Sequence, residues 1–314
     1  MATAAAIAVD GLSRSFADLV AVDRLTFSVK RGELFGLVGP DGAGKTTTLR
    51  MLAGVLRPDS GEAIVGQTSV VLHPETVKHD IAYMPQRFGL YVDLTVIENI
   101  EFYADLYRVP RAERPARLER LFAFSNLGPF QNRLAGALSG GMKQKLGLCC
   151  ALIHQPEILL LDEPTFGVDP ISRRDLWLII HEMVGRGTTV VVSTSYMDET
   201  ERFDRVALLH DGHLKAVDTP AKLQQSIGGE ILVIHTADVR QARDIAGSLT
   251  GVRGATIFGD TVHVLVDSTA EMKSLIEEQL AAAGCGVTDI ITTAPSMEDV
   301  FISYMAQHEG ERDG

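Results

Sequence analysis

The segment GPDGAGKTT at residues 39–47 combines the residue types that bind phosphate. It fits the pattern G-x-x-x-x-G-K-[ST], with Gly39, Gly44, Lys45 and Thr46 at the fixed places. Glycines let the backbone curl so that several N–H groups face one anion, and a following helix adds its positive end. Lys45 then reaches the outer phosphates, and the Thr46 hydroxyl binds Mg²⁺. We therefore predict a nucleotide site rather than an empty glycine-rich turn. The other predicted loop contacts are Pro40, Asp41, Gly42, Ala43 and Thr47.

Two adjacent carboxylates, Asp162 and Glu163, follow the apolar run ILLL at 158–161. A carboxylate at the end of a buried strand can hold Mg²⁺ through its hydration shell, and the next one can orient a water against the γ-phosphate. An isolated Asp-Glu pair would be a solvated strand end. In a chain with a phosphate loop, the pair predicts a metal role for Asp162 and a catalytic role for Glu163.

A third motif, LSGGMKQKL at 138–146, lies between the phosphate loop and the acidic pair. Ser139 and the amides of Gly140 and Gly141 open a predicted helix and form a second anion site. In this order the three motifs resemble those of the ABC-transporter ATPases, whose signature is most often LSGGQ; here Met142 is in the fifth place. The resemblance implies ATP and Mg²⁺ as cofactors, and a head-to-tail pair of subunits in which each signature completes the other subunit's pocket.

Other residues match that family one by one. Phe16 stands where the family has an aromatic residue stacked on adenine, although it is also a candidate core residue. Gln86, in YMPQ, resembles the Q-loop glutamine that contacts Mg²⁺ and water and senses the membrane subunit. Asp169 resembles the D-loop aspartate that crosses the dimer interface. The segments GVDPISRRDLW (167–177) and PSMEDVF (295–301) are similar to the drug-exporter branch.

The resemblance implies the ATPase subunit of a transporter for drugs or other hydrophobic compounds, with integral membrane permease subunits as partners. Two alternatives stay open: an importer ATPase, which would share every ATP motif, and a nucleotide-dependent switch that is not coupled to transport.

Ser195 departs from the family pattern. The loop after the strand that ends near residue 194 carries a histidine in the family, and it hydrogen-bonds the γ-phosphate; here the sequence is Thr194-Ser195-Tyr196. Serine is shorter and cannot become cationic. Losing one preorganised donor costs on the order of 3 kcal/mol, or 10²- to 10³-fold in rate. Either Ser195 acts through a water in a slower enzyme, or the chain is the impaired half of a heterodimer, which we favour over a homodimer.

Composition limits the partners. The net charge is −12, with 41 acidic and 29 basic residues, which argues against nucleic acid as the main ligand. The three cysteines, Cys149, Cys150 and Cys285, form no zinc pattern and predict buried, reduced thiols of a cytosolic protein. No apolar run reaches the roughly 18 residues of a membrane span. We therefore expect a peripheral protein at the cytoplasmic face of the cell membrane.

Strands and helices alternate, which predicts a mostly parallel α/β sheet. The resemblance implies the P-loop NTPase fold of the ABC ATPases, with a mixed sheet. The first 30 residues alternate polar and apolar and predict antiparallel strands with turns at Gly11 and at Arg31-Gly32. Apolar runs predict buried strands at 34–39, 158–162 and 188–194. Thr95 and Glu98 form a capping box, which predicts a helix closed by Pro110. Further helices are predicted at 111–124 and 140–153.

The pattern changes near residue 222, where strands and helices follow in the order of a small βαββαβ module. We predict an ATPase domain at 1–222, with a helical subdomain at about 87–155. An α+β accessory domain at 228–306 and a disordered tail at 307–314 complete the prediction.

Overall fold

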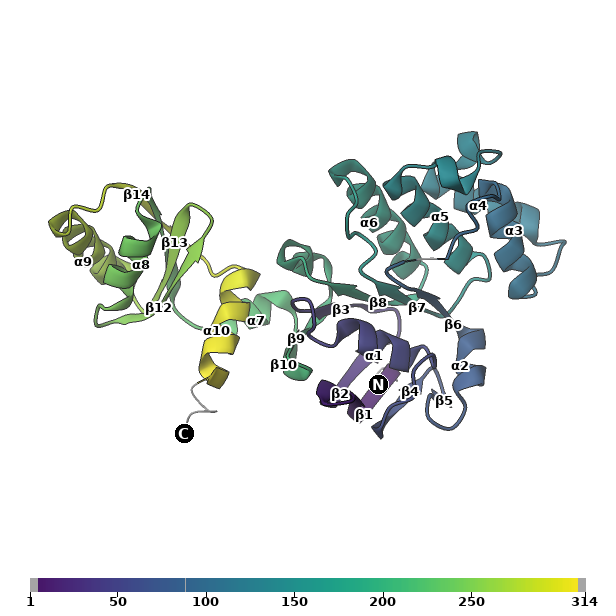
Figure 1. Cartoon of the computed structure of the whole chain (residues 1–314), viewed down its shortest axis with the longest axis horizontal. Helices are drawn as coiled ribbons and strands as arrows, with labels where there is room; N and C mark the ends of the chain where they lie inside the picture. The colour runs from purple at the N-terminus through teal and green to yellow at the C-terminus, as the bar shows by residue number, and fades with distance from the viewer. Residues whose placement is uncertain (1–4, 88, 310–314) are drawn as a thin grey trace. The chain divides into compact units, whose positions relative to one another are not determined.

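The computed structural model describes residues 5–87 and 89–309. Its backbone contacts divide into two compact units, with the division between Asp218 and Thr219 (Figure 1). The first unit contains the elements from β1 to β10, and the second those from α7 to α10. No helix within the described residues is both long enough and apolar enough to cross a membrane.

The central sheet of the first unit has six strands in the order β10-β9-β3-β8-β7-β6. All neighbours pair in parallel except β9 and β10, which form an antiparallel hairpin. The strands β3, β7 and β8 are buried throughout, as their continuous apolar runs predict. Parallel pairing brings the carboxyl ends of these strands to one edge of the sheet. The strands are β3 (Leu34–Val38), β6 (Ile81–Met84), β7 (Ile158–Asp162), β8 (Thr189–Thr194), β9 (Arg205–His210) and β10 (His213–Asp218).

A second, antiparallel sheet has the order β2-β1-β4-β5. The predicted turn at Gly11 is wrong, because β1 continues through this residue and the turn lies at residues 17–18. Gly11 has a φ of 59° and lies where the pairing of β1 with β2 shifts register, so this glycine marks a β-bulge. The turn predicted at Arg31-Gly32 is confirmed. The strands are β1 (Ala5–Phe16), β2 (Leu19–Lys30), β4 (Ser60–Val65) and β5 (Thr68–Ser69).

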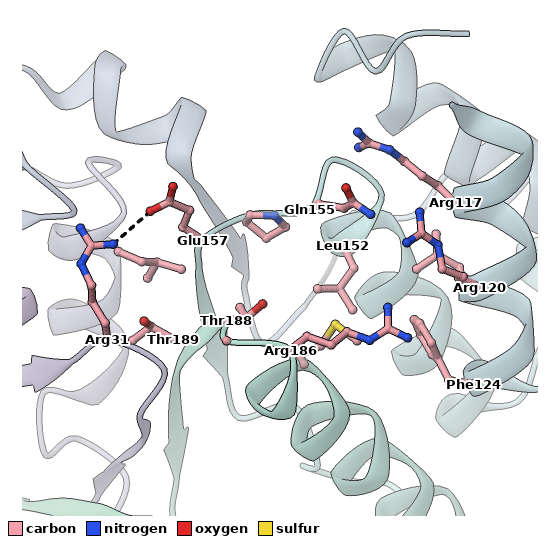
Figure 2. A pocket seen from close by; sticks show the side chains of 15 residues that line it. Arg31, Arg117, Arg120, Phe124, Leu152, Gln155, Glu157, Arg186, Thr188 and Thr189 are labelled. Carbon is pink, nitrogen blue, oxygen red and sulfur yellow. Dashed lines mark hydrogen bonds and ion pairs between the residues drawn. The ribbon is translucent and has the colours of Figure 1, made fainter. Parts of the chain in front are cut away.

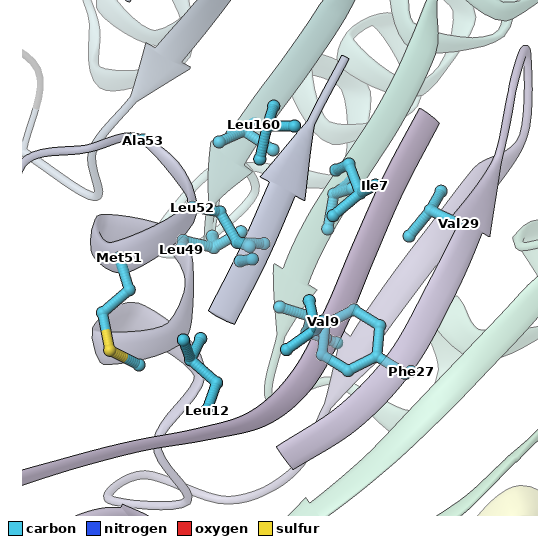
Figure 3. Packing of buried hydrophobic residues seen from close by; sticks show 14 of the residues in the cluster. Ile7, Val9, Leu12, Phe27, Val29, Leu49, Met51, Leu52, Ala53 and Leu160 are labelled. Carbon is cyan, nitrogen blue, oxygen red and sulfur yellow. The ribbon is translucent and has the colours of Figure 1, made fainter. Parts of the chain in front are cut away.

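The helix α1 (Lys45–Leu52) shares one apolar core with both sheets (Figure 3). Leu49 and Leu52 of this helix are buried together with Leu12 of β1, Phe27 of β2 and Leu160 of β7. Full burial of such a side chain contributes about 1.5–3 kcal/mol, so several of them fix the position of the helix. The phosphate loop precedes α1 directly and is therefore held on a rigid support.

The remaining helices of the first unit include the one that the capping box predicts. In the structure the Glu98 amide donates to Thr95 Oγ1 at 3.3 Å, and the Thr95 amide donates to Glu98 Oε2 at 2.8 Å, so the capping box is confirmed. The helices are α2 (Pro74–Asp80), α3 (Val96–Leu106), α4 (Arg114–Ser125), α5 (Gly140–Leu152) and α6 (Pro170–Gly185), with a 3₁₀ segment at Met197–Arg202.

The second unit contains an antiparallel sheet in the order β12-β13-β11-β14 with two helices packed against it, a ferredoxin-like arrangement of the predicted βαββαβ order. The helix α7 begins within the predicted range 1–222 but belongs to this unit. The helix α10 reaches Glu309 and so extends into the predicted tail at 307–314, of which 310–314 lie outside the described residues. The elements are α7 (Pro220–Ser226), β11 (Glu230–Thr236), α8 (Val239–Gly247), β12 (Val252–Phe258), β13 (Thr261–Val266), α9 (Thr269–Ala282), β14 (Val287–Thr293) and α10 (Met297–Glu309).

Candidate nucleotide site

The predicted phosphate loop connects β3 to α1 and curls around the amine of Lys45. Lys45 Nζ donates to the carbonyls of Gly39 at 2.7 Å and Pro40 at 2.9 Å, and lies 3.1 Å from Glu163 Oε1. The side chains of Lys45 and Glu163 are only 4% and 8% exposed, so each charge depends on the other. Gly44 has a φ of 97°, and a Cβ at this position would lie 2.5 Å from the carbonyl oxygen of Ala21, so only glycine fits.

Asp162 is buried at the end of β7 and accepts three hydrogen bonds. Thr46 Oγ1 and Ser193 Oγ donate to Asp162 Oδ1 at 2.9 Å and 2.8 Å, and the Tyr83 hydroxyl donates to Oδ2 at 3.3 Å. Burial, and then the charge of Asp162, raise the pKa of Tyr83 to about 12, so this hydroxyl remains a donor at neutral pH. Tyr83 and Ser193 were missed by the sequence analysis. Ser193 could have been noticed as a polar residue that follows the apolar run VVV within the buried strand TVVVST.

Glu163 has a backbone φ of 48°, in the left-handed region that non-glycine residues seldom adopt. Its amide donates to Ser193 Oγ at 2.9 Å. Its carboxylate faces Lys45 and also accepts from Gln86 Nε2 at 3.3 Å. Strained backbone of this kind persists where the surrounding structure holds it, and it is concentrated at functional sites.

Lys45, Gln86 and Glu163 line one cavity of about 560 Å³. Most residues of the predicted phosphate loop line this cavity, together with Gln86, Glu163 and Phe16, which come from separate parts of the chain. The Phe16 side chain is 44% exposed, and the Arg14 guanidinium lies 4.9 Å from its ring centroid. Phe16 is therefore a surface aromatic residue rather than a core residue. The lining residues that the sequence analysis missed are Leu19, Val20, Ala21, Phe166 and Asp211.

The predicted signature residues lie elsewhere and do not line this cavity. Ser139 caps α5, with its Oγ accepting from the Met142 amide at 3.3 Å, and both Ser139 and Gly140 are exposed. Gly141 packs against the start of α6, where an added Cβ would lie 2.2 Å from Ser172 Oγ. Asp169 caps α6 by accepting from the Ser172 amide at 2.9 Å, which lowers its pKa. The structure thus brings Gly141 and Asp169 together, apart from the phosphate loop.

Ser195 is half-buried and does not line the cavity, although the neighbouring Thr194 carbonyl accepts from the Gly39 amide at 3.3 Å. The segment that follows Ser195 is held by the fully buried carboxylate of Glu199. Thr194 Oγ1, Arg173 Nε and Trp177 Nε1 donate to this carboxylate at 2.6, 2.8 and 3.0 Å. Glu199 was missed by the sequence analysis, because nothing in its local sequence distinguishes it from the exposed acidic residues beside it.

A phosphate loop after a buried strand, an acidic pair at the neighbouring strand end and a serine-capped glycine helix together define an ABC ATPase cassette. The family model described as "ABC transporter" matches residues 22–166. The chain is 43% identical over 306 residues to YbhF, a probable multidrug ABC transporter ATP-binding protein of Escherichia coli (strain K12), covering 96% of this chain and 52% of YbhF. It is 33% identical over 313 residues to DrrA, a daunorubicin/doxorubicin resistance ATP-binding protein of Streptomyces peucetius, covering 98% of this chain and 94% of DrrA.

The chain therefore belongs to the family of ABC transporter ATP-binding proteins. It spans about half the length of YbhF, at 52%. Among solved structures it is similar to the ATP-binding cassette MJ0796, a dimer bound to ADP and Pi, with 25% identity and a TM-score of 0.62 over 68% of this chain and 98% of that one. The predicted fold class is confirmed by this likeness.

Proposed function

We propose that this chain binds ATP with Mg²⁺ and hydrolyses it, as the ATP-binding subunit of an ABC exporter. The observation that carries the proposal is the meeting of Lys45, Gln86 and Glu163 at one cavity beside the phosphate loop. Thr46 Oγ1 and Asp162 Oδ1 are hard oxygen donors 2.9 Å apart, which is the ligand chemistry that Mg²⁺ prefers. These two residues, with Gln86, would hold the ion, and Mg²⁺ would neutralise phosphate charge.

The side chains have separate roles in this proposal. The loop amides and Lys45 bind the β- and γ-phosphates, and Phe16 stacks on the base. The γ-phosphate supplies Lys45 with a new anionic partner and so frees the Glu163 carboxylate, now 3.1 Å from the Lys45 amine, to orient a water for attack. Gln86 Nε2, 3.3 Å from Glu163, helps to position that carboxylate.

The test is Glu163→Gln, which keeps the shape of the side chain and removes its charge. We expect ATP binding to persist and hydrolysis to fall by about 10²- to 10³-fold, measured as phosphate release with excess Mg²⁺. Glu157→Gln is the matched control, because Glu157 is an exposed glutamate just before the start of the same strand. Equal loss in both variants, or none in Glu163→Gln, would contradict the assignment.

Export is the favoured direction, and drugs or other hydrophobic compounds are the proposed substrates. YbhF and DrrA are named for multidrug transport and for daunorubicin/doxorubicin resistance, which supports this proposal. The chain would work at the cytoplasmic face of the cell membrane on integral permease subunits. Purification of the tagged chain from membranes should recover a multi-span protein, and transport assays in vesicles should show the direction. Recovery of no membrane protein would favour a nucleotide-dependent switch, and inward transport would favour an importer.

A heterodimer is the proposed assembly, because Ser195 cannot supply the imidazole of the family while Ser139 and Gly140 are exposed and available to a partner's pocket. The ATPase rate of the purified chain should be low and should rise at least about tenfold in Ser195→His. In the mixed complex, Ser139→Ala should reduce the rate of the partner's pocket. Brisk hydrolysis by the unmodified chain, with no gain in Ser195→His, would overturn the heterodimer.

A further inference from the structure

We propose that the first unit contains a second ligand site, which binds a small organic anion with an apolar body. The site is a cleft of about 500 Å³, within the range of about 300–1,000 Å³ that is usual for small-molecule pockets. We call it the arginine cleft (Figure 2). Its lining residues are Arg31, Arg117, Arg120, Leu121, Phe124, Leu152, Gln155, Pro156, Glu157, Ile158, Met183, Arg186, Gly187, Thr188 and Thr189.

Four guanidinium groups from three parts of the fold line the cleft. Glu157 is the one carboxylate in its lining, and Glu113 and Glu182 pair with two of the arginines from outside the lining. Arg31 comes from the turn before β3, Arg117 and Arg120 from α4, and Arg186 from the residue after α6. The carboxylate of Glu157 pairs with Arg31 at 3.3 Å. The four guanidinium groups and these three carboxylates leave a local excess of positive charge at the cleft, in a chain whose net charge is −12. Such a concentration attracts anions.

The present partners of Arg120 and Arg186 are weak enough to be exchanged. Arg117 is only 14% exposed and is held both by Glu113 and by the Ile153 carbonyl, to which its Nη1 donates at 2.9 Å. Arg186 pairs with Glu182 across one helical turn, and both side chains are partly exposed. Surface pairs of this kind contribute about 0.3–0.5 kcal/mol. Arg120 Nε donates to the Ala116 carbonyl at 3.1 Å, and within the described residues Arg120 has no carboxylate partner. Arg120 and Arg186 are thus available to a ligand.

The remaining lining selects the kind of anion. Leu121 and Phe124 of α4 lie in the cleft with Leu152, Ile158 and Met183, so apolar surface adjoins the guanidinium groups. A guanidinium group can donate two parallel hydrogen bonds to a carboxylate, phosphate or sulfonate group. The adjoining apolar surface favours a ligand that also has a hydrocarbon part. An inorganic anion would leave that wall uncovered. A small organic acid or phosphate ester satisfies both surfaces.

The arginine cleft is separate from the nucleotide cavity. The two share no lining residue. The strand β7 connects them, since Ile158 at its start lines the cleft and Asp162 at its end lies beside the nucleotide cavity. The helices α5 and α6 likewise end at the cleft and begin at Ser139 and Asp169. Because the two sites share no lining residue, a ligand can occupy the arginine cleft whether or not the chain hydrolyses ATP.

The test uses a pair of fluorescent probes that differ in one charge. Anilinonaphthalene sulfonate carries the anion and the aromatic body, and phenylnaphthylamine is its neutral counterpart. The full chain is titrated with each, with and without a saturating non-hydrolysable ATP analogue. We expect the sulfonate to bind at one site with unchanged affinity in the presence of nucleotide, and Arg120→Gln/Arg186→Gln to weaken it by at least about tenfold. Arg57→Gln/Arg111→Gln, two exposed arginines outside the cleft, is the matched control.

Hydrogen exchange locates the probe independently. Slower exchange at residues 152–158 and 183–189, with none at 39–47, is expected on addition of the sulfonate. The unchanged emission of the buried Trp177 would show that the variants fold. The proposal is overturned if the cleft variant binds the sulfonate as well as the control variant, if the neutral probe binds equally well, or if nucleotide displaces the sulfonate.

Discussion

At the scale of the residue, Glu199 connects the end of β8 to α6. Its carboxylate is fully buried and accepts from Thr194, Arg173 and Trp177. A buried charge of this kind is tolerated only when every part of it has a partner. Glu199 thereby holds the short segment that contains Ser195, the position where the family has its histidine.

We predict that Glu199→Ala lowers the unfolding free energy of the first unit by about 3 kcal/mol, because it leaves Arg173 and the Trp177 indole without their buried acceptor. Urea unfolding followed by Trp177 fluorescence measures this, since the chain has one tryptophan. Asp198→Ala is the control: this exposed carboxylate also pairs with Arg173, at 3.0 Å, and should cost less than about 1 kcal/mol. Similar losses in both would contradict the role of Glu199.

His154 gives a second prediction at this scale. Its ring stacks on Tyr107 at a centroid distance of 3.8 Å, and burial lowers its pKa to about 4. The unfolded chain takes up a proton at a higher pH than the folded chain does, so stability is lost as the pH falls from about 6.5 toward 4. His154→Phe should therefore reduce the drop in unfolding free energy between roughly pH 7 and pH 4.5 by about 2 kcal/mol. An unchanged drop in Trp177-monitored urea unfolding would refute it.

At the scale of the element, α3 depends on the reciprocal capping between Thr95 and Glu98. Thr95→Ala removes one acceptor from the exposed amides of the first turn, and we predict a loss of about 1 kcal/mol in the unfolding free energy. Thr95→Ser keeps the hydroxyl and should cost much less. Faster hydrogen exchange confined to residues 96–99 in Thr95→Ala would show that the effect is local, and equal stability of the two variants would count against it.

The arrangement of the elements also explains most of the predictions from sequence that were wrong. A glycine within an alternating pattern signals either a turn or a bulge, and the pairing of β1 with β2 decides for the bulge at Gly11. The helix α10 was overlooked, although its start has a readable signal. The Ser296 amide donates to Asp299 Oδ2 at 2.8 Å, and the Asp299 amide donates to Ser296 Oγ at 3.2 Å, which is the reciprocal pattern of a capping box.

At the scale of the whole molecule, each unit has its own apolar core. The core of the second unit contains buried side chains from its strands and from α8 and α9. We predict that the fragment 219–314 folds alone, with a cooperative thermal transition by circular dichroism. Its heat-capacity change should be about 1.2–1.4 kcal/mol/K, as expected for a domain near 100 residues. A fragment with helical signal but no cooperative transition would show that the second unit needs the first.

The phosphate loop, the acidic pair and the helix cap at Thr95 could be predicted from the sequence, because each of these depends on residues close together in the chain. Backbone curvature, helix starts and strand ends are local properties, and short motifs can encode them. The burial of β3, β7 and β8 was readable for the same reason, from the length and composition of each apolar run.

Which side chains meet depends on how the strands and helices pair and pack. The parallel pairing of β7 with β8 places Ser193 against Asp162 and Glu163, and the pairing of β6 with β7 brings Tyr83 to Asp162. The structure also placed Ser195 outside the lining of the nucleotide cavity and assembled the arginine cleft. Contacts between segments far apart in the chain depend on the register and packing of whole elements, and no single segment carries that information.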